Sequence, residues 1–363
     1  MASINFKHTP FGDLALISMR GCEDIASQVD YYLKQWRNIP DDESFVVPAN
    51  CPRFGTGEAK AVLKHTARGL DAYILCDCFN YSVTYKMYGQ TVPMSPDDHY
   101  QDLKRIIAAL GGKARRITVI MPMLYEGRQH RRTTRESMDC AMALQELVAM
   151  GVKNIVTFDA HDPRVNNAIP LDGFDNVQAA YQMIKALLKT VPDIKLDRDH
   201  TMIVSPDEGG MGRCIYYSSV LGLDLGMFYK RRNYSVIVNG RNPIEAHEFL
   251  GNDITGKDLI LVDDMISSGE SMLDIAAKLK EKGAGRIFIF STFGLFVEGF
   301  EKFDQYYADG KIDKIFTTNL IYQPQELLDR EWYCSVNMSK YIALLVETLN
   351  YDNSISSLLD PVD

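Results

Sequence analysis

The chain has 363 residues, a hydrophobic share of 46% and a formal net charge of −9 at pH 7, which suits roughly two globular domains and argues against non-specific nucleic-acid binding. No apolar run approaches the length of a membrane span, and the segment from Met1 to Met19 lacks the charged and apolar parts of a signal peptide. The seven cysteines are scattered without a CxxC pair, as in proteins of a reducing compartment, so we expect a cytoplasmic protein that contacts neither membrane nor nucleic acid.

Strand and helix patterns alternate along the first half of the chain. Buried strands are predicted at residues 71–75 and 117–121, with a helix at 98–110 between them. Residues 79–95 are rich in tyrosine and methionine without a clear period, and we expect an inserted loop or hairpin there. The polar segment from Arg53 to Glu58 surrounds one aromatic residue, and taken alone it is typical of a hairpin turn.

Two strand ends in the first half carry candidate binding groups. Four arginines lie between Arg128 and Arg135, after a predicted strand, where α/β proteins bind ligands. Guanidinium groups suit a polyphosphate, although a solvated basic loop is the alternative. His161 follows the next strand beside Asp159 and Asp162, which is consistent with either a magnesium or nucleotide contact or a structural histidine.

The second half repeats the alternation. A strand at 201–204 ends in an acidic, glycine-rich turn that contains Asp207. A strand at 225–229 leads into Lys230, Arg231 and Arg232, and the polar stretch from there to Gly240 predicts a mobile loop that carries these cations.

The second half is organised around the stretch from Leu259 to Ser271. Four apolar residues predict a buried parallel strand, Asp263 and Asp264 follow at its carboxyl end, and a small-residue loop leads into a helix. The amides of residues 268–271 would converge at the positive end of that helix, which predicts a phosphate site. The acidic pair cannot hold phosphate, so we expect it to serve sugar hydroxyls or a metal beside it. An ordinary strand–helix turn with a serine cap is the alternative.

These patterns together predict two three-layer α/β domains with mostly parallel sheets, because strand and helix alternate in both halves. The polar segment 166–175 is a plausible crossing between them. We expect an N-terminal domain over 1–176, with the insertion near 79–95, and a C-terminal domain over 177–363.

Several motifs, in their order along the chain, resemble the ribose-phosphate diphosphokinase (phosphoribosyl-pyrophosphate synthetase) family. They are Arg53-Phe54-x-x-Gly57-Glu58, Arg68-Gly69-x-Asp71, Arg128-Gln129-x-Arg131, Asp159-x-His161, Ser205-Pro206-Asp207-x-Gly209-Gly210, Lys230-Arg231-Arg232, the 263–271 stretch and the tail at 353–356. The resemblance runs from about residue 50 to the end of the chain. It implies two similar phosphoribosyltransferase-like domains in a dimer-based homo-oligomer, of which a hexamer is one form, with ATP bound at a subunit interface.

The resemblance also implies a reaction and roles for particular residues. The reaction moves the β,γ-diphosphoryl group of MgATP to the 1-hydroxyl of ribose 5-phosphate and releases AMP, with Mg²⁺ as cofactor. On the ATP side the implied residues are Phe54 and Glu58 on adenine, Arg128, Gln129 and Arg131 on ATP, His161 and Asp207 on magnesium, and Lys230 and Arg232 in catalysis. On the acceptor side they are Asp263 and Asp264 on the ribose hydroxyls, and Ser267, Ser268, Gly269, Glu270 and Ser271 on the 5-phosphate.

Three departures from the family pattern leave alternatives open. Ser267 and His130 stand where the family usually has Asp, and Glu270 stands where it usually has Gly. We expect Glu270 to point to solvent, since a carboxylate is favourable in the first turn of a helix. A catalytically silent homologue that binds an active synthetase or its ligands is one alternative. A type I phosphoribosyltransferase, which would consume the product, is another.

Overall fold

A computed structural model describes residues 9–232 and 244–359 of the chain, and the side chains of residues 9–229 and 248–358. The chain divides into two compact units. The first comprises Met1–Ala179, Asn319–Tyr322 and Asn337–Asp363, and the second comprises Ala180–Thr318 and Gln323–Val336. Among the described residues, none of the helices combines the length and apolar composition needed to span a bilayer.

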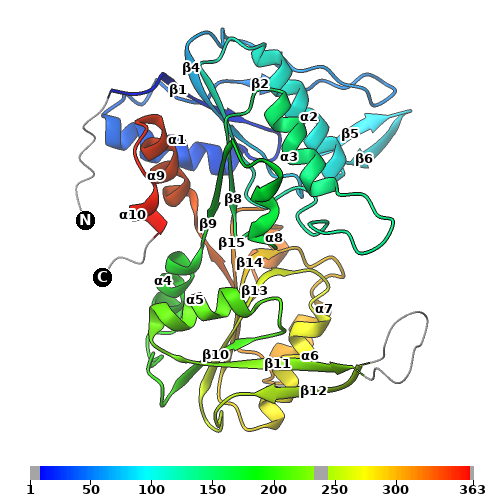
Figure 1. Ribbon diagram of the computed structural model, residues 1–363, viewed down its shortest axis with the longest axis vertical. Coiled ribbons are helices and arrows are strands. Elements are labelled where there is room, and N and C mark those ends of the chain that lie inside the picture. Colours follow the sequence, from blue (N-terminus) through cyan, green and yellow to red (C-terminus); the bar gives the residue numbers. More distant parts are fainter. Residues whose placement is uncertain (1–8, 233–243, 360–363) are drawn as a thin grey trace. The chain divides into compact units, whose positions relative to one another are not determined.

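The first unit is built on a five-stranded parallel sheet with the order β1-β4-β7-β8-β9 (Figure 1). The strands are β1 (Asp13–Ser18), β4 (Leu70–Leu75), β7 (Arg116–Ile120), β8 (Asn154–Phe158) and β9 (Gly173–Val177). Most of them are buried on both faces, which explains why they are near-continuous apolar runs in the sequence.

Helices cover both faces of this sheet. Helices α2 (Pro96–Leu110) and α3 (Asp139–Ala149) share one core cluster with alternate strand residues, while α1 (Glu23–Arg37) packs against α9 (Ser339–Asn350) on the other side (Figure 1). The start of α2 follows directly from its sequence. Ser95 and Asp98 form a reciprocal capping box, and Pro96 occupies the first turn, where its missing N–H costs nothing.

Helix α9, near the end of the chain, belongs to the first unit, not to the second. Arg116 forks onto the buried carboxylate of Asp71, with Nε–Oδ1 at 2.8 Å and Nη2–Oδ2 at 2.7 Å. Asn350 Nδ2 donates to the same Asp71 Oδ2 at 2.8 Å, and Arg116 donates to the Leu349 carbonyl at 2.7 Å. These contacts join α9 to β4 and β7, so the last part of the chain departs from the expected second domain over 177–363. The expected boundary near residue 177 lies close to the change of unit at Ala179.

The second unit contains a seven-stranded sheet with the order β12-β11-β10-β13-β14-β15-β16, parallel except for the edge strand β12. The strands are β10 (Thr201–Ser205), β11 (Asp224–Arg232), β12 (Ile244–Leu250), β13 (Asp258–Ile266), β14 (Ile287–Gly294), β15 (Lys314–Thr318) and β16 (Tyr333–Val336). After β10 the chain adds strands on one side, then returns to place β13 on the other side. The order therefore reverses between β10 and β13, which is where α/β sheets bind ligands.

This second sheet is also covered on both faces. Helices α6 (Glu270–Glu281) and α7 (Glu301–Ala308) share one core cluster with alternate residues of β10, β13 and β14. Helix α5 (Met211–Leu221) packs on β10, β11 and β13, and α4 (Ala180–Thr190) packs on β15 and β16. The predicted α/β class with mostly parallel sheets is confirmed. Short elements complete the chain: β2 (Ala49–Asn50), β3 (Val62–Leu63), η1 (Pro163–Ala168), α8 (Gln325–Leu328) and α10 (Ser356–Leu359).

Two local predictions have different outcomes. The insertion at 79–95 contains an antiparallel hairpin of β5 (Thr84–Met87) and β6 (Gln90–Pro93), as expected. The mobile loop expected from Lys230 onward does not begin there, because β11 continues through Arg232 and pairs with β12, with a shift of register between Arg231 and Arg232. Pairing with the edge strand β12 extends the sheet as far as Lys230, Arg231 and Arg232. The remainder of that predicted loop, residues 233–240, lies outside the described residues.

Candidate functional site

The predicted acidic pair lies near the carboxyl end of β13. Asp264 is buried, and its N–H donates to Asp263 Oδ1 at 2.9 Å. Burial, and then the charge of Asp264, raise the pKa of Asp263 well above its ordinary value, whereas the Arg213 guanidinium lowers it. It is therefore unfavourable for both carboxyl groups to be ionised at once. Hydrogen bonds from sugar hydroxyls, or a bound cation, would stabilise the doubly ionised pair.

Arg213 is a residue of this site that the sequence analysis missed. Its Nη1 lies 3.7 Å from Asp263 Oδ1, and its side chain is 10% exposed. It comes from the first turn of α5, directly after the glycine-rich turn that ends in Gly210. Its position in the sequence could have indicated this role. A helix that starts just after the end of one strand places its first residues close to the end of the neighbouring strand, which here carries the acidic pair.

The loop after β13 is held rigidly by its backbone. The carbonyl of Ile266 accepts the Leu295 amide at 2.9 Å, and the carbonyl of Ser267 accepts the Val297 amide at 3.0 Å. Gly269 has φ +81°, and a Cβ at this position would collide with the ring of Phe303. Only glycine fits this close approach. The first N–H groups of α6, which have no partner within the helix, are therefore held in a defined position by this loop.

Glu270 points away from this loop. Its Oε1 accepts from Lys302 Nζ at 2.6 Å, and its side chain is 61% exposed. The hydrogen bond from Lys302 also lowers the pKa of Glu270. The expected outward orientation is confirmed, so the Glu270 carboxylate is held away from the loop by Lys302.

Asp207 follows β10, the neighbour of β13 in the sheet. Its Oδ1 accepts from the Gly210 amide at 3.1 Å, and its carbonyl accepts from Ser205 Oγ at 2.7 Å. Asp207 therefore lies at the same edge of the second sheet as the acidic pair. Lys230 and Arg232 lie on β11, the strand beyond β10, and their side chains are outside the described part of the chain.

The candidate residues of the first unit lie on exposed loops. Arg128 and Arg131 are exposed after β7. The Gln129 amide donates to the carbonyls of Arg131 at 3.3 Å and Ser137 at 2.9 Å, so it braces its own loop. His161, after β8, is exposed and lies next to His130.

The segment from Arg53 to Glu58 is a hairpin turn, as its sequence indicates. The Phe54 amide donates to the Glu58 carbonyl at 2.7 Å, and the Phe54 ring is 55% exposed. The Glu58 carboxylate accepts from Thr56 Oγ1 at 2.8 Å. The inserted hairpin supports the turn, because the Tyr88 amide donates to the Gly55 carbonyl at 2.8 Å.

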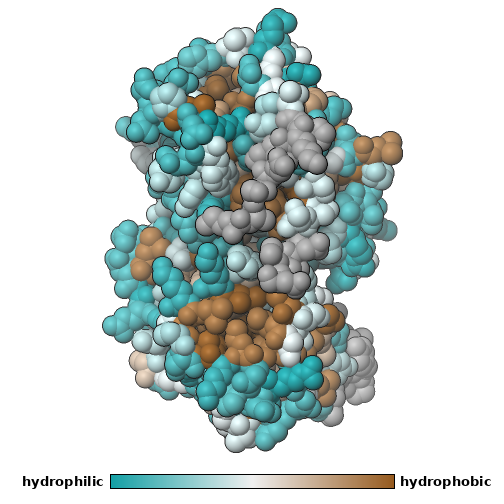
Figure 2. Space-filling model, turned by 90° about the vertical axis from the view of Figure 1, so that its left-hand side faces the viewer, coloured by the Kyte–Doolittle hydropathy of each residue, from teal (hydrophilic) through white to brown (hydrophobic). Residues whose placement is uncertain are grey.

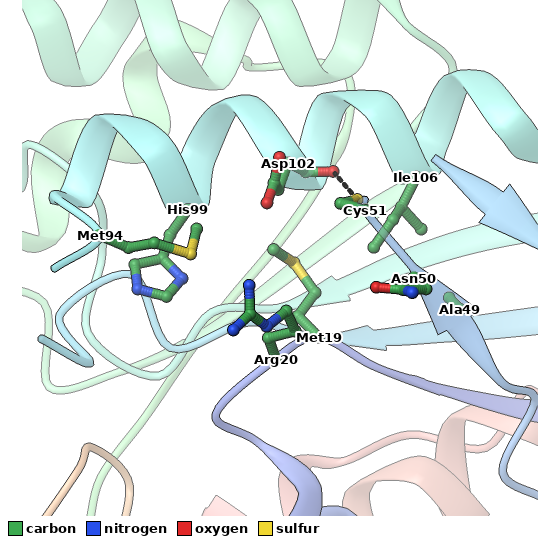
Figure 3. A pocket seen from close by; sticks show the side chains of 9 residues that line it. All are labelled: Met19, Arg20, Ala49, Asn50, Cys51, Met94, His99, Asp102 and Ile106. Carbon is green, nitrogen blue, oxygen red and sulfur yellow. Dashed lines mark hydrogen bonds between the residues drawn. The ribbon is translucent and has the colours of Figure 1, made fainter. Parts of the chain in front are cut away.

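A small pocket lies in the same unit near α2 (Figure 3). Its lining residues are Met19, Arg20, Ala49, Asn50, Cys51, Met94, His99, Asp102 and Ile106. Asp102 accepts from Arg53 at 2.8 Å and from Arg105 at 2.7 Å, and His99 Nε2 contacts the Asn80 carbonyl at 2.9 Å. Arg20 Nη2 donates to the Thr84 carbonyl at 2.8 Å, so the charged residues of the lining already have partners, and Asp102 also holds Arg53 of the turn. None of the predicted ligand residues lines this pocket.

The predicted site residues therefore fall into two groups, one on each unit. The second unit brings Asp207, Asp263, Asp264 and the 267–271 loop to one edge of its sheet. The first unit carries the arginine loop, His161 and the Phe54 turn. Among the described residues, no cluster of three or more His, Cys, Asp or Glu side chains is arranged to hold a metal ion.

Apolar side chains also gather on one face of the second unit (Figure 2). The exposed apolar side chains of the second unit include Leu188 of α4 and Ile215 of α5. Contiguous apolar surface of this kind marks interaction sites in many proteins.

Comparisons with known proteins agree over most of the chain. Residues 14–151 match the family model described as the N-terminal domain of ribose phosphate pyrophosphokinase, and residues 236–360 match the phosphoribosyl synthetase-associated domain. The chain is 26% identical over 314 residues to the ribose-phosphate pyrophosphokinase of Pasteurella multocida, covering 85% of this chain and 90% of that protein. It is 27% identical over 316 residues to that of Haemophilus ducreyi, with 86% and 90% covered. The crystal structure of phosphoribosylpyrophosphate synthetase from Mycobacterium smegmatis superposes with a TM-score of 0.74 at 21% identity, covering 94% of this chain and 100% of that one.

Proposed function

The chain belongs to the ribose-phosphate pyrophosphokinase family, and on that premise we propose that it transfers the β,γ-diphosphoryl group of ATP to the 1-hydroxyl of ribose 5-phosphate. The products are 5-phosphoribosyl 1-diphosphate and AMP. The observation that carries this proposal is the acidic pair beside a rigid phosphate loop at the reversal point of the second sheet.

The second unit binds the acceptor in this proposal. The amides at the start of α6 and the hydroxyls of Ser267, Ser268 and Ser271 hold the 5-phosphate, because a helix N-terminus favours an anion. Asp263 and Asp264 accept hydrogen bonds from the ribose hydroxyls. The raised pKa of Asp263 supports this role, since bound donors relieve the repulsion between the two carboxyl groups.

The first unit binds the donor nucleotide. Arg128 and Arg131 neutralise the phosphates of ATP, and Gln129 shapes the loop that carries them. Phe54 and Glu58 contact the adenine of a neighbouring subunit, which is consistent with the exposure of the Phe54 ring. The chain then acts as a dimer-based homo-oligomer in the cytoplasm, and the apolar face in Figure 2 supports subunit contact.

The reaction requires positive charge more than a covalent nucleophile. Attack by the ribose hydroxyl at the β-phosphorus builds negative charge on the transferring group, and fixed cations stabilise it. We assign this role to Lys230 and Arg232 at the end of β11. A magnesium ion, when bound, would neutralise phosphate charge. The Asp207 carboxylate suits this hard cation, whereas the His161 imidazole is a softer donor.

The proposal is tested by incubating purified protein with Mg²⁺, ATP and ribose 5-phosphate and following the mixture by ³¹P NMR. We expect AMP and 5-phosphoribosyl 1-diphosphate in equal amounts, and no AMP when ribose 5-phosphate is left out. Binding of both substrates without turnover would instead identify the silent homologue. Consumption of added 5-phosphoribosyl 1-diphosphate with a nucleobase would identify a phosphoribosyltransferase.

A further inference from the structure

The inserted hairpin of β5 and β6 (Figure 1) carries an aromatic residue in an unusual place. Met87 pairs with Gln90, so Tyr88 and Gly89 form a two-residue loop at the tip. Both loop residues have positive φ, +49° at Tyr88 and +78° at Gly89. Such loops favour Asn, Asp and Gly, whereas a bulky side chain is unfavourable at positive φ. Tyr88 is also 78% exposed, so its ring adds little to the core, and a strained residue of this kind points to a function.

The tip of the hairpin is hydrogen bonded to the Phe54 turn. The Tyr88 amide donates to the carbonyl of Gly55, the residue after Phe54, at 2.8 Å. Phe54 is 55% exposed. The hydrogen bond therefore brings two exposed aromatic residues, from segments about thirty positions apart in the sequence, onto one continuous surface of the first unit.

Side-chain contacts fix the hairpin and the turn to each other. A Cβ at Gly57 would lie only 2.9 Å from Met87 Sδ, so the two backbones approach as closely as glycine allows. The guanidinium of Arg53 lies 4.6 Å from the centroid of the Tyr85 ring, within cation–π distance. The Tyr85 hydroxyl donates to Asp98 of α2 at 3.3 Å. The positions of Phe54 and Tyr88 are thus set by one packed assembly.

We propose that Tyr88 is a second aromatic contact for the adenine of the donor nucleotide, beside Phe54, and that it favours purine donors. Aromatic side chains stack on bases because every base has a π face, and a purine presents a larger face than a pyrimidine. The inference rests on the proposed function, which assigns Phe54 to adenine. It adds a specificity-determining residue from the inserted hairpin.

The test is calorimetry on the full chain with Mg²⁺, using a non-hydrolysable ATP analogue and tripolyphosphate as ligands. Tyr88→Asn removes the ring but keeps a residue that tolerates positive φ, so the variant should be at least as stable as the parent. It should weaken the ATP analogue about fivefold or more, as expected when a base loses an aromatic partner. It should bind tripolyphosphate, which has no base, like the parent.

Three further comparisons sharpen this result. Tyr88→Phe retains the ring and should bind the ATP analogue within about twofold of the parent. Tyr31→Asn, at an exposed tyrosine of α1, should bind both ligands like the parent. The preference for the ATP analogue over the matching CTP analogue should narrow in Tyr88→Asn.

Fluorescence of Tyr88→Trp gives a second readout, because stacking on adenine should quench the added tryptophan and tripolyphosphate should not. Unchanged affinity for the ATP analogue in Tyr88→Asn, an equal loss for both ligands, or a smaller oligomer by sedimentation would each overturn the proposal. AMP formation is scored separately. A chain that makes AMP while Tyr88→Asn binds the analogue like the parent keeps the proposed function and loses this contact. A chain that makes no AMP, but whose Tyr88→Asn variant loses affinity for the analogue alone, does the reverse.

Discussion

The candidate ligand-binding residues of the two units lie on different kinds of structure. In the second unit the acidic pair lies within β13, and the phosphate loop is fixed by hydrogen bonds and by the contact of Gly269 with Phe303. In the first unit Arg128 and Arg131 lie exposed on a loop. Sheet order accompanies this difference: the second sheet reverses between β10 and β13, whereas the strands of the first follow one another in chain order. We infer that the second unit recognises the shape of ribose 5-phosphate, whereas the first mainly supplies positive charge to the phosphates of ATP.

The largest effect on stability and on ligand binding is expected at Gly269. Gly269→Ala forces a side chain into Phe303 and retains a positive φ, which should cost roughly 2–5 kcal/mol of unfolding free energy and abolish ribose 5-phosphate binding. Urea unfolding and calorimetry measure the two effects. Gly222→Ala is the matched control, since Gly222 also has positive φ, +66°, but has nothing within 4 Å of an added Cβ. Equal stability of the two variants would show that the loop is not held as described.

The next effect concerns rate. If Lys230 acts mainly on the transferring group, Lys230→Ala should lower kcat by about a hundredfold or more while both substrates bind nearly as before. Steady-state kinetics and equilibrium binding separate these quantities. Lys185→Ala, at an exposed lysine of α4, should leave both unchanged. Activity of the Lys230 variant within about threefold of the parent would remove its catalytic role.

In both units the sequence predicts local structure better than contacts between distant segments. Hydrophobic runs, the acidic pair and small loop residues all reflect local backbone geometry, so the site at β13 follows from them. Two features depend on contacts between distant segments and leave little local signal. One is the return of α9 to the first unit through Asp71, Arg116 and Asn350. The other is the approach of Arg213 to Asp263.

A smaller effect tests the acidic pair through pH. The folded-state pKa of Asp263 lies above its unfolded value, about 3.9, so the folded chain retains this proton to higher pH and its unfolding free energy falls as pH rises between the two values. Asn cannot ionise, so Asp263→Asn should gain stability relative to the parent as the pH rises above about 4, measured by urea unfolding at a series of pH values. Asp253→Asn should show the opposite sign, because hydrogen bonds from Thr255 lower the pKa of Asp253. If Asp263→Asn instead lost stability relative to the parent as the pH rises, the description of a buried pair of repelling carboxyl groups would be contradicted.

The smallest effect is expected at Glu270. Its side chain is bound to Lys302 and turned away from the loop, so Glu270→Gly should change ribose 5-phosphate affinity by less than about tenfold. Calorimetry measures this change, with Lys302→Ala as the companion variant. A parent that makes no AMP but is activated by Glu270→Gly would show that the carboxylate blocks the phosphate, and would favour the silent homologue.

The division of labour between the units is tested most directly by one paired binding measurement. Calorimetry with ribose 5-phosphate and with a non-hydrolysable ATP analogue is carried out on Asp264→Asn and on Arg128→Ala. Loss of a charged hydrogen bond, worth about 1.5–3 kcal/mol, should weaken ribose 5-phosphate by more than about tenfold in the first variant and leave the nucleotide within about threefold. The second variant should show the reverse pattern, and its loss should shrink at high salt because the arginine is exposed. If both variants weaken the same ligand, the two units do not divide donor and acceptor as proposed.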